Sequence, residues 1–286
     1  MPELPEVETV RRMVEPQVVG RTITGVTLRD FPAVLETPID GADPAALLVG
    51  RTVSGTRRRG KYLAFDLGDD LLLVVHLRMT GRLILAETRA EPIRFEHAAL
   101  HFDNGWDLRF GDQRKFGRLS VVLPETWEAL NARLGLEPFD RRLTPALLET
   151  ALARRPGPIK NALLDQHLIA GLGNIYVDEA LYRSKIHPLR PARDLDAEEL
   201  ERLVEAIRHV LTLSLENQGT TFSTFENPYG ESGSNARFLQ AYDRARKGEV
   251  CERCGTPFVR IVVAGRGTSF CPTCQVIPLP ELAVEE

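Results

Sequence analysis

The chain has 286 residues, with 36 Lys and Arg against 40 Asp and Glu and a formal net charge of −4. This length suits one large domain or two ordinary ones, and the acidic sum gives no whole-chain sign of a nucleic-acid partner. No run approaches ~20 apolar residues, and the amino terminus is acidic without an apolar segment. We therefore expect a cytoplasmic protein that does not cross a membrane.

The opening MPELPEVETV predicts a helix, because a proline suits a first turn, glutamates suit the positive end of the helix dipole, and valines recur at helical spacing. Such a helix does not need Pro2. Removal of Met1 would leave Pro2 with a free secondary amine, and an α-amino group titrates near pH ~8 against ~10.4 for lysine. A neutral amine beside carboxylates has the parts of a Schiff-base catalyst. On these residues alone both interpretations stay open.

The first part of the chain after this helix predicts strands. Six short branched or aromatic runs are separated by turn signals such as LGDD and FDNGW. They are TITGVTLRD, KYLAFDL, LLLVVHLRM, RLILA, AALHFD and WDLRF. A hinge is expected near residues 124 to 140, after which the pattern becomes helical.

Three segments of the second part predict helices. Thr144-Pro145 is an N-cap followed by a first-turn proline, and NALLDQHLIAGLG carries apolar residues at helical intervals until its glycines. DAEELERLVEAIRHVLTLSLENQG begins with a capping-box pattern at Asp196 and Glu199 and ends at Gly219. Residues 220 to 248 follow as a polar stretch without period, too long for an ordinary connection.

Four cysteines form the pairs CERC and CPTC, at Cys251, Cys254, Cys271 and Cys274. This spacing is typical of a zinc site in which two short loops each contribute two thiolates. Two disulfides are the alternative, and they fit poorly with an unsecreted chain. Between the pairs, FVRIVVAGRGTSF predicts a β-hairpin that turns at Gly265 to Gly267.

Two segments are basic although the net charge of the whole chain is negative. The run from Arg51 to Lys61 contains five cations and no acid, and residues 237 to 266 are rich in arginine.

The predicted class is α+β. We expect an N-terminal β-sandwich domain with an amino-terminal helix at residues 1–130, and a C-terminal helical domain at residues 136–286. The latter would include a zinc finger at about residues 245–280.

Six segments follow one another along the chain in this order: PELPEVET, GKYL, HLRMTG, DQRKFG, IKNALLDQHLIAGLGNIYVDEAL and GRGTSFCPTCQ. Together they closely resemble the formamidopyrimidine-DNA glycosylases, bacterial base-excision repair enzymes. The resemblance implies a monomeric glycosylase and abasic-site lyase, associated with the nucleoid, with one structural zinc ion and no organic cofactor. It also implies that the substrate is double-stranded DNA containing 8-oxoguanine or formamidopyrimidines, and that the helical domain is of the helix–two-turn–helix kind.

The resemblance also implies catalytic roles. Pro2 would be the nucleophile that forms the Schiff base, followed by β,δ-elimination. Glu3 would transfer protons at the sugar, with Glu6 as a supporting carboxylate. Lys61 matches the catalytic lysine of the family, and Arg266 matches the arginine that the hairpin places on a phosphate. Taken singly, both cations could be ordinary solvated residues.

Further residues are expected to contact DNA. Met79, Arg114 and Phe116 would fill the gap left by an extruded base, although a methionine at a strand end could also be core. Family members often carry two histidines around RFEHAAL, where this chain has Phe95 and His97. The remaining expected contacts are His97, Arg155, Lys160 and Asn174.

Two rival interpretations stay open. Endonuclease VIII, the sister family, uses the same chemistry on oxidised pyrimidines, but its opening usually carries glycine where this chain has Leu4. Leu4 together with Arg114-x-Phe116 favours the purine enzyme. A non-catalytic zinc-ribbon DNA-binding protein would explain the cysteines and basic runs, but neither PELPE nor Lys61.

Overall fold

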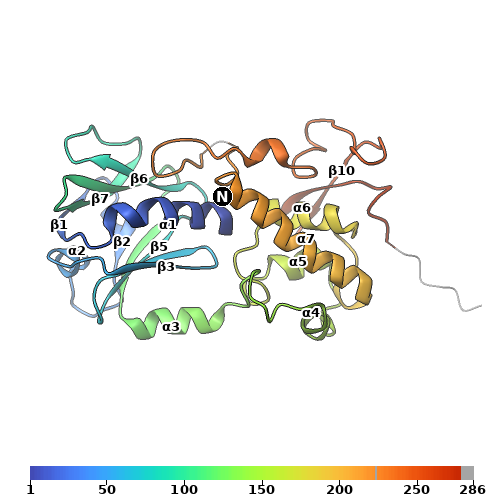
Figure 1. Ribbon diagram of the computed structural model, residues 1–286, viewed down its shortest axis with the longest axis horizontal. Coiled ribbons are helices and arrows are strands. Elements are labelled where there is room, and N and C mark those ends of the chain that lie inside the picture. The colour runs from blue at the N-terminus through green and yellow to red at the C-terminus, as the bar shows by residue number, and fades with distance from the viewer. Residues whose placement is uncertain (223, 278–286) are drawn as a thin grey trace, which may run out of the picture. The chain divides into compact units, whose positions relative to one another are not determined.

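The computed structural model describes residues 1–222 and 224–277. These residues form two compact units (Figure 1). Unit 1 combines Met1–Gly135 with Thr212–Arg237, and unit 2 combines Leu136–Leu211 with the chain from Phe238 onward. Residues 212–237 therefore pack with the amino-terminal unit, although the sequence groups them with the C-terminal domain. The predicted boundary between residues 130 and 136 stays a prediction.

Unit 1 contains two β-sheets. The first has the order β1-β7-β8-β6 with antiparallel neighbours. Its strands are β1 (Ile23–Leu28), β7 (Glu96–Phe102), β8 (Trp106–Asp112) and β6 (Gly81–Glu87). The second has the order β2-β9-β5-β4-β3, in which only the short β2 pairs in parallel. Its strands are β2 (Leu35–Glu36), β9 (Arg118–Val122), β5 (Leu72–His76), β4 (Tyr62–Asp66) and β3 (Gly55–Arg59).

One hydrophobic core joins these sheets to α1 (Leu4–Val18). Val7, Val10 and Val14 of α1 are fully buried, as the helical spacing predicted. They share the core with Phe65 of the five-stranded sheet and Phe110 of the four-stranded sheet. A sandwich with an amino-terminal helix is thus confirmed. Three smaller elements complete this part: η1 (Pro32–Val34), α2 (Pro44–Leu48) and α3 (Pro124–Arg133).

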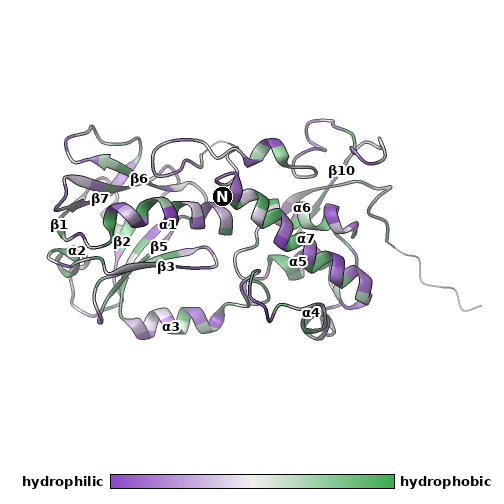
Figure 2. Ribbon diagram, in the orientation of Figure 1, coloured by the Kyte–Doolittle hydropathy of each residue, from purple (hydrophilic) through white to green (hydrophobic). Residues whose placement is uncertain are grey.

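Unit 2 is mainly helical and has its own core. Its helices are α4 (Pro145–Leu152), α5 (Ile159–Leu164), α6 (Asn174–Ser184), η2 (Ala192–Asp194), α7 (Ala197–Glu216) and η3 (Asn235–Phe238), of which α7 and η3 each extend beyond the unit. Figure 2 shows hydrophilic and hydrophobic residues alternating along α7, and the apolar positions Leu203, Ile207 and Leu211 are fully buried. The hairpin consists of β10 (Val259–Val263) and β11 (Arg266–Phe270).

The structure corrects three local predictions. The expected hinge contains helix α3, which begins at Pro124 and packs Trp127 into a small core. The helix expected through NALLDQHLIAGLG ends at Leu164, because the Asp165 carboxylate accepts the backbone N–H of His167 and starts a turn. The hairpin turns at Ala264-Gly265, where both residues have positive φ, one position earlier than expected.

The predicted caps are confirmed. Thr144 accepts the Leu147 N–H at the start of α4. At α7, the Asp196 carboxylate accepts the Glu199 N–H at 2.7 Å, and the Glu199 carboxylate accepts the Asp196 N–H at 3.0 Å. This reciprocal pair satisfies two backbone donors that the helix itself cannot use.

Asp196→Ala should therefore lower the free energy of unfolding by about 1 kcal/mol, because one N-cap acceptor is lost. Urea unfolding followed by far-UV circular dichroism measures the change. Asp194→Ala is the matched control, since Asp194 is exposed and its pair with Arg193 at 3.5 Å is a surface contact. Equal stability of Asp196→Ala and the wild type would contradict the capping role.

Candidate active site and nucleic-acid interface

The amino-terminal segment is packed into unit 1. Pro2 is buried, and Glu3 and Glu6 are each 1 % exposed. One oxygen of the Glu6 carboxylate accepts the Glu3 N–H at 2.7 Å, and the other accepts the Thr220 N–H at 2.8 Å. Glu6 therefore fixes the terminal segment to the beginning of the 220–237 segment. The two carboxylates for which proton transfer and support are predicted are thereby brought together, close to Pro2 in the chain.

Lys61 lies in the turn between β3 and β4 and is 9 % exposed. Its charge acts on His76 at the end of β5, a residue that the sequence analysis missed. Burial, with the charges of Arg78 and Lys61, lowers the pKa of His76 to about 3. The His76 ring contacts Tyr62 edge-on, with centroids 4.5 Å apart, and its Nδ1 accepts the Arg78 N–H. His76 is therefore a neutral imidazole beside a basic surface.

The expected gap-filling residues share one anchor, the buried side chain of Asp112. One of its oxygens accepts the Arg114 N–H at 3.1 Å, and the other accepts the Phe116 N–H at 2.8 Å. The hydroxyl of Thr80, next to Met79, donates to the same carboxylate. Met79 and Phe116 are exposed by 39 % and 49 %. A buried anion thus holds exposed, partly apolar loop residues in place.

Arg114 and Phe116 also contact one another. The guanidinium carbon of Arg114 lies 4.7 Å from the centroid of the Phe116 ring. The backbone of Lys115 between them is left-handed, with φ 58°. An exposed guanidinium stacked on an exposed ring suits an unpaired base and its neighbour. The Asp112 anchor was not found from the sequence, where its only signal is the position of an aspartate before a Gly-flanked loop.

His97 lies inside the fold of unit 1. It is only 3 % exposed, and its Nε2 bonds to the backbone oxygen of Asp112 at 2.8 Å. The ring also meets Phe31 edge-on. The buried side chain therefore supports the loop that Asp112 anchors, while its contact with DNA stays a prediction.

Lys160 is likewise not an exposed cation. Its side chain is fully buried, and its Nζ contacts Asp178 at 2.5 Å and the Thr268 hydroxyl at 2.7 Å. Asp178 also accepts the Ser269 N–H. Lys160 therefore joins α5 and α6 to β11 and positions the hairpin, while its contact with a DNA phosphate stays a prediction.

The hairpin holds Arg266 at its turn. Arg266 is exposed, and in the described part of the chain its guanidinium has no carboxylate partner. The amide nitrogen of Asn174, the first residue of α6, donates to Gly267 O at 3.0 Å. Asn174 and Arg266 are thus brought together through neighbouring residues. Arg155 lies elsewhere in unit 2 and pairs with Asp165 at 2.8 Å.

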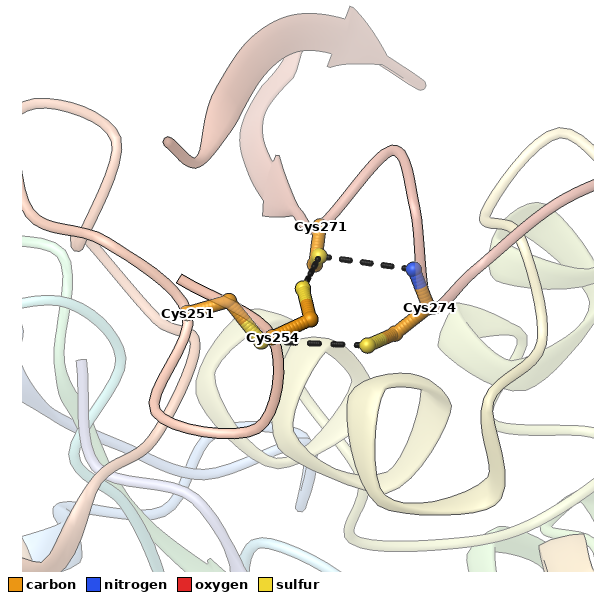
Figure 3. Close-up of side chains that lie close together, drawn as sticks. All are labelled: Cys251, Cys254, Cys271 and Cys274. Atoms are coloured by element: carbon orange, nitrogen blue, oxygen red, sulfur yellow. Dashed lines mark hydrogen bonds between the residues drawn. The ribbon is translucent and has the colours of Figure 1, made fainter. Parts of the chain in front are cut away.

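The four cysteines converge around one point (Figure 3). Their sulfur atoms all lie within 4.8 Å of one another, and none is disulfide-bonded. Tetrahedral zinc with Zn–S bonds of about 2.3 Å places its sulfurs about 3.8 Å apart. The Cys251–Cys274 and Cys254–Cys271 sulfur distances of 3.9 Å and 3.5 Å fit this geometry. The arrangement therefore suits one structural zinc ion, and four thiolates leave no position for a reactive water.

Tyr182 of α6 supports this cluster and was also missed. Its hydroxyl lies 3.2 Å from the Cys251 sulfur, and the Arg253 guanidinium carbon lies 4.1 Å from the centroid of its ring. Arg253 in turn donates to the Tyr182 backbone oxygen at 2.9 Å. The first cysteine knuckle is thereby attached to the helix that begins at Asn174.

No helix among residues 1–222 and 224–277 is long and apolar enough to span a membrane.

A β-sandwich with a packed amino terminus, a helical unit and a four-cysteine hairpin together define the architecture of a helix–two-turn–helix DNA glycosylase. Family models agree along the chain. They match the formamidopyrimidine-DNA glycosylase N-terminal domain at residues 1–119, its H2TH domain at 134–226, and the zinc finger found in FPG and IleRS at 248–276.

Individual relatives extend over nearly the whole chain. A formamidopyrimidine-DNA glycosylase of Chloroflexus aurantiacus is 47 % identical over 276 residues, covering 96 % of this chain and 98 % of the relative. A Lactococcus lactis FPG mutant solved with Fapy-dG containing DNA is 37 % identical, with a TM-score of 0.88, over 96 % of this chain and 99 % of the other. Wild-type Lactococcus lactis FPG, solved with oxidized pyrimidine containing DNA, has a TM-score of 0.86 over the same shares, also at 37 % identity.

The chain belongs to the formamidopyrimidine-DNA glycosylase family. It is a DNA glycosylase of base-excision repair, and its α+β class and structural zinc site agree with the predictions from sequence.

We expect one zinc ion per chain by elemental analysis. Cys254→Ala should lose the ion and weaken DNA binding, because the hairpin then lacks its metal support. A thiol-reactive dye gives an independent measurement, since the sequence holds only four cysteines. All four should be protected in the native protein and become reactive after chelation. Full reactivity of the native protein before chelation would contradict the site.

His76 should make stability depend on pH. Its pKa is about 3 when folded, against about 6.5 when unfolded. Between these values the unfolded chain binds the additional proton, so the free energy of unfolding decreases as the pH falls from about 6.5 towards 3. In His76→Gln the slope of the free energy of unfolding against pH should decrease by an amount that corresponds to at most one bound proton. Urea unfolding at several pH values measures it, and parallel curves for both proteins would contradict the assignment.

Proposed function

We propose that the chain removes oxidised purines, 8-oxoguanine and formamidopyrimidines, from double-stranded DNA through a Schiff base on Pro2. The observation that carries this proposal is the packed terminus, in which Pro2 and Glu3 are buried and Glu6 is fixed by two backbone N–H groups. A secondary amine exposed by removal of Met1 would lie directly beside these carboxylates. The proposal extends to a monomer acting in the cytoplasm on DNA of the nucleoid.

The chemistry follows from the groups available. The Pro2 nitrogen attacks C1′ of the damaged nucleotide, the bond to the base breaks, and the base leaves with a proton. Glu3 transfers protons at the sugar. The sugar ring then opens: the C1′–O4′ bond breaks, O4′ takes a proton from Glu3, and C1′ is left as an iminium ion on the Pro2 nitrogen. This iminium acidifies the C2′ proton, whose removal expels the 3′ phosphate by β-elimination. A second elimination expels the 5′ phosphate, and water then hydrolyses the imine to regenerate the amine.

Cations would stabilise the phosphates during these steps. Arg266 supports this role, since it is exposed and has no carboxylate partner among the described residues. Lys61 would contribute from the β3–β4 turn, and Arg155 and Asn174 would contact phosphates from the helical unit. Met79, Arg114 and Phe116 would occupy the gap that the extruded nucleotide leaves.

Borohydride trapping on abasic DNA tests the nucleophile, because reduction converts the imine into a stable cross-link. We expect mass spectrometry after digestion to find the cross-link on the peptide that begins with Pro2. Pro2→Gly would still offer a primary amine, so it should form the cross-link but release damaged bases more slowly. A cross-link on Lys61 or another internal lysine, with the terminal peptide unmodified, would show that the mechanism is wrong.

Glu3→Gln separates proton transfer from binding. It keeps the shape of the side chain and should reduce base excision by about 10²- to 10⁴-fold, the usual contribution of general acid–base catalysis. Binding to DNA should survive, as measured by fluorescence anisotropy. Lys61→Ala is the comparison variant, expected to weaken phosphate contacts while imine formation on an abasic site persists. Wild-type excision by Glu3→Gln would refute the role of Glu3.

The lesion class needs its own experiment. Duplexes with 8-oxoguanine opposite each of the four bases should be cleaved faster than one with thymine glycol. The pyrimidine lesion belongs in the panel because a Lactococcus lactis relative was solved with oxidized pyrimidine containing DNA. Preference for thymine glycol would favour the endonuclease VIII-like alternative, and no cleavage of any duplex would favour a binding protein.

A further inference from the structure

Three loops of unit 1 depend on Asp112: residues 77–80, 93–97 and 112–117, called here the three-loop surface. The Thr80 hydroxyl donates to the Asp112 carboxylate, and the Asp112 N–H donates to Phe95 O at 3.0 Å. Arg114 and Phe116 donate to the same carboxylate from the third loop. The family resemblance assigned Met79, Arg114, Phe116 and His97 to DNA here, but nothing assigned Arg94 or Phe95.

Backbone strain gathers on this surface. Seven non-glycine residues of the described chain have positive φ, and three of them occupy these loops, one in each: Arg78 at 54°, Phe95 at 58° and Lys115 at 58°. A left-handed backbone is unfavourable for such side chains and persists only where the surroundings hold it. Clustering of this kind is typical of functional sites rather than of ordinary turns.

Exposed positive charge gathers there too. Arg78, Arg94, Arg114 and Lys115 are all exposed, and none makes an ion pair in the part of the chain that the structure describes. Most other arginines of unit 1 do pair with carboxylates; Arg82, for example, pairs with Glu226. In a protein of net charge −4, a group of uncompensated cations is suited to a polyanion.

Arg94 is held more firmly than an ordinary surface arginine. Its guanidinium carbon lies 4.6 Å from the centroid of the Phe95 ring, and its backbone oxygen accepts a bond from Arg82 Nη2 at 2.8 Å. The buried Glu96 carboxylate accepts the Ile93 N–H at 3.0 Å and fixes the same turn. The arrangement repeats the Arg114–Phe116 pair, whose separation is 4.7 Å.

We propose that Arg94, held in place by the Phe95 ring, binds a backbone phosphate of the DNA and extends the contact surface beyond Met79, Arg114 and Phe116. The ligand is a phosphodiester rather than a base, because the guanidinium already covers the ring face while its N–H edge has no partner among residues 1–222 and 224–277. This inference rests on the proposed function, since it requires that the chain bind DNA.

The experiment is a fluorescence anisotropy titration with a duplex that contains a tetrahydrofuran abasic-site analogue, repeated at several KCl concentrations. Arg94→Ala should bind several-fold more weakly at physiological salt, and its slope of log K against log salt should be shallower by about 1, because one phosphate contact is lost. Arg94→Lys should keep the wild-type slope but recover only part of the affinity, since lysine lacks the planar fork.

Arg89→Ala is the matched control, because Arg89 is an exposed arginine of the same unit, and in the described structure its side chain makes no hydrogen bond, ion pair or ring contact with the three-loop surface. It should keep both affinity and slope. Phe95→Ala should weaken binding in the wild type but have no effect in the Arg94→Ala background, since the ring acts through the guanidinium. Equal losses in both backgrounds would overturn the positioning role of Phe95.

Wild-type affinity and slope in Arg94→Ala would overturn the inference itself. Borohydride trapping of the wild type on abasic DNA separates this result from failure of the proposed function. If the wild type is trapped and binds the duplex, an unchanged Arg94→Ala refutes only the phosphate contact. If the wild type neither binds nor is trapped, the proposed function is wrong as well. Unfolding temperatures identify a destabilised Phe95→Ala, and the two Arg94 variants then decide alone.

Discussion

The packing of the amino terminus depends on the Glu6 carboxylate. It accepts N–H groups from Glu3 and from Thr220, and it is almost completely buried. A buried carboxylate is costly unless such bonds satisfy it, so the first turn of α1 and the segment after α7 must adopt matching positions. Gly219 makes room for it, because a Cβ built there would lie 3.1 Å from Glu6 Cγ. The anchor thereby fixes the position of the amine that the proposed mechanism requires.

Buried charges elsewhere follow the same logic and set the positions of exposed ones. Asp112 is satisfied by N–H and hydroxyl groups from loops that carry Arg114 and Phe116. Lys160 is satisfied by Asp178 and by Thr268, two residues after Arg266. In each case the charged group that fixes the loop, Asp112 or Lys160, is buried. The arginine that the loop carries, Arg114 or Arg266, is exposed and available to a DNA phosphate. The distinction between scaffold and contact is therefore one of burial, not of residue type.

The difference between buried and exposed charges explains which features could be predicted from the sequence. Signals that act within a few residues were sufficient for α1, the Asp196 capping box and the four-cysteine site. The family resemblance supplied the function. Neither could tell that Lys160 and His97 are buried, because their partners, such as Thr268, lie on elements far along the chain. Helix α3 was missed because its apolar stripe is weak, and only Trp127 of its residues is buried.

Unit 1 consists of two separate stretches of the chain, and this affects how it folds during synthesis. Residues 1–135 leave the ribosome long before residues 212–237, yet Phe225 belongs to their core and Pro228 accepts the N–H of Leu85 in β6. Contacts of such long sequence separation form late, and an unfinished unit exposes apolar surface meanwhile. The residues translated first are thus enclosed only when the last quarter of the chain arrives. A truncated or stalled product would carry the terminal proline but not the surroundings that hold it.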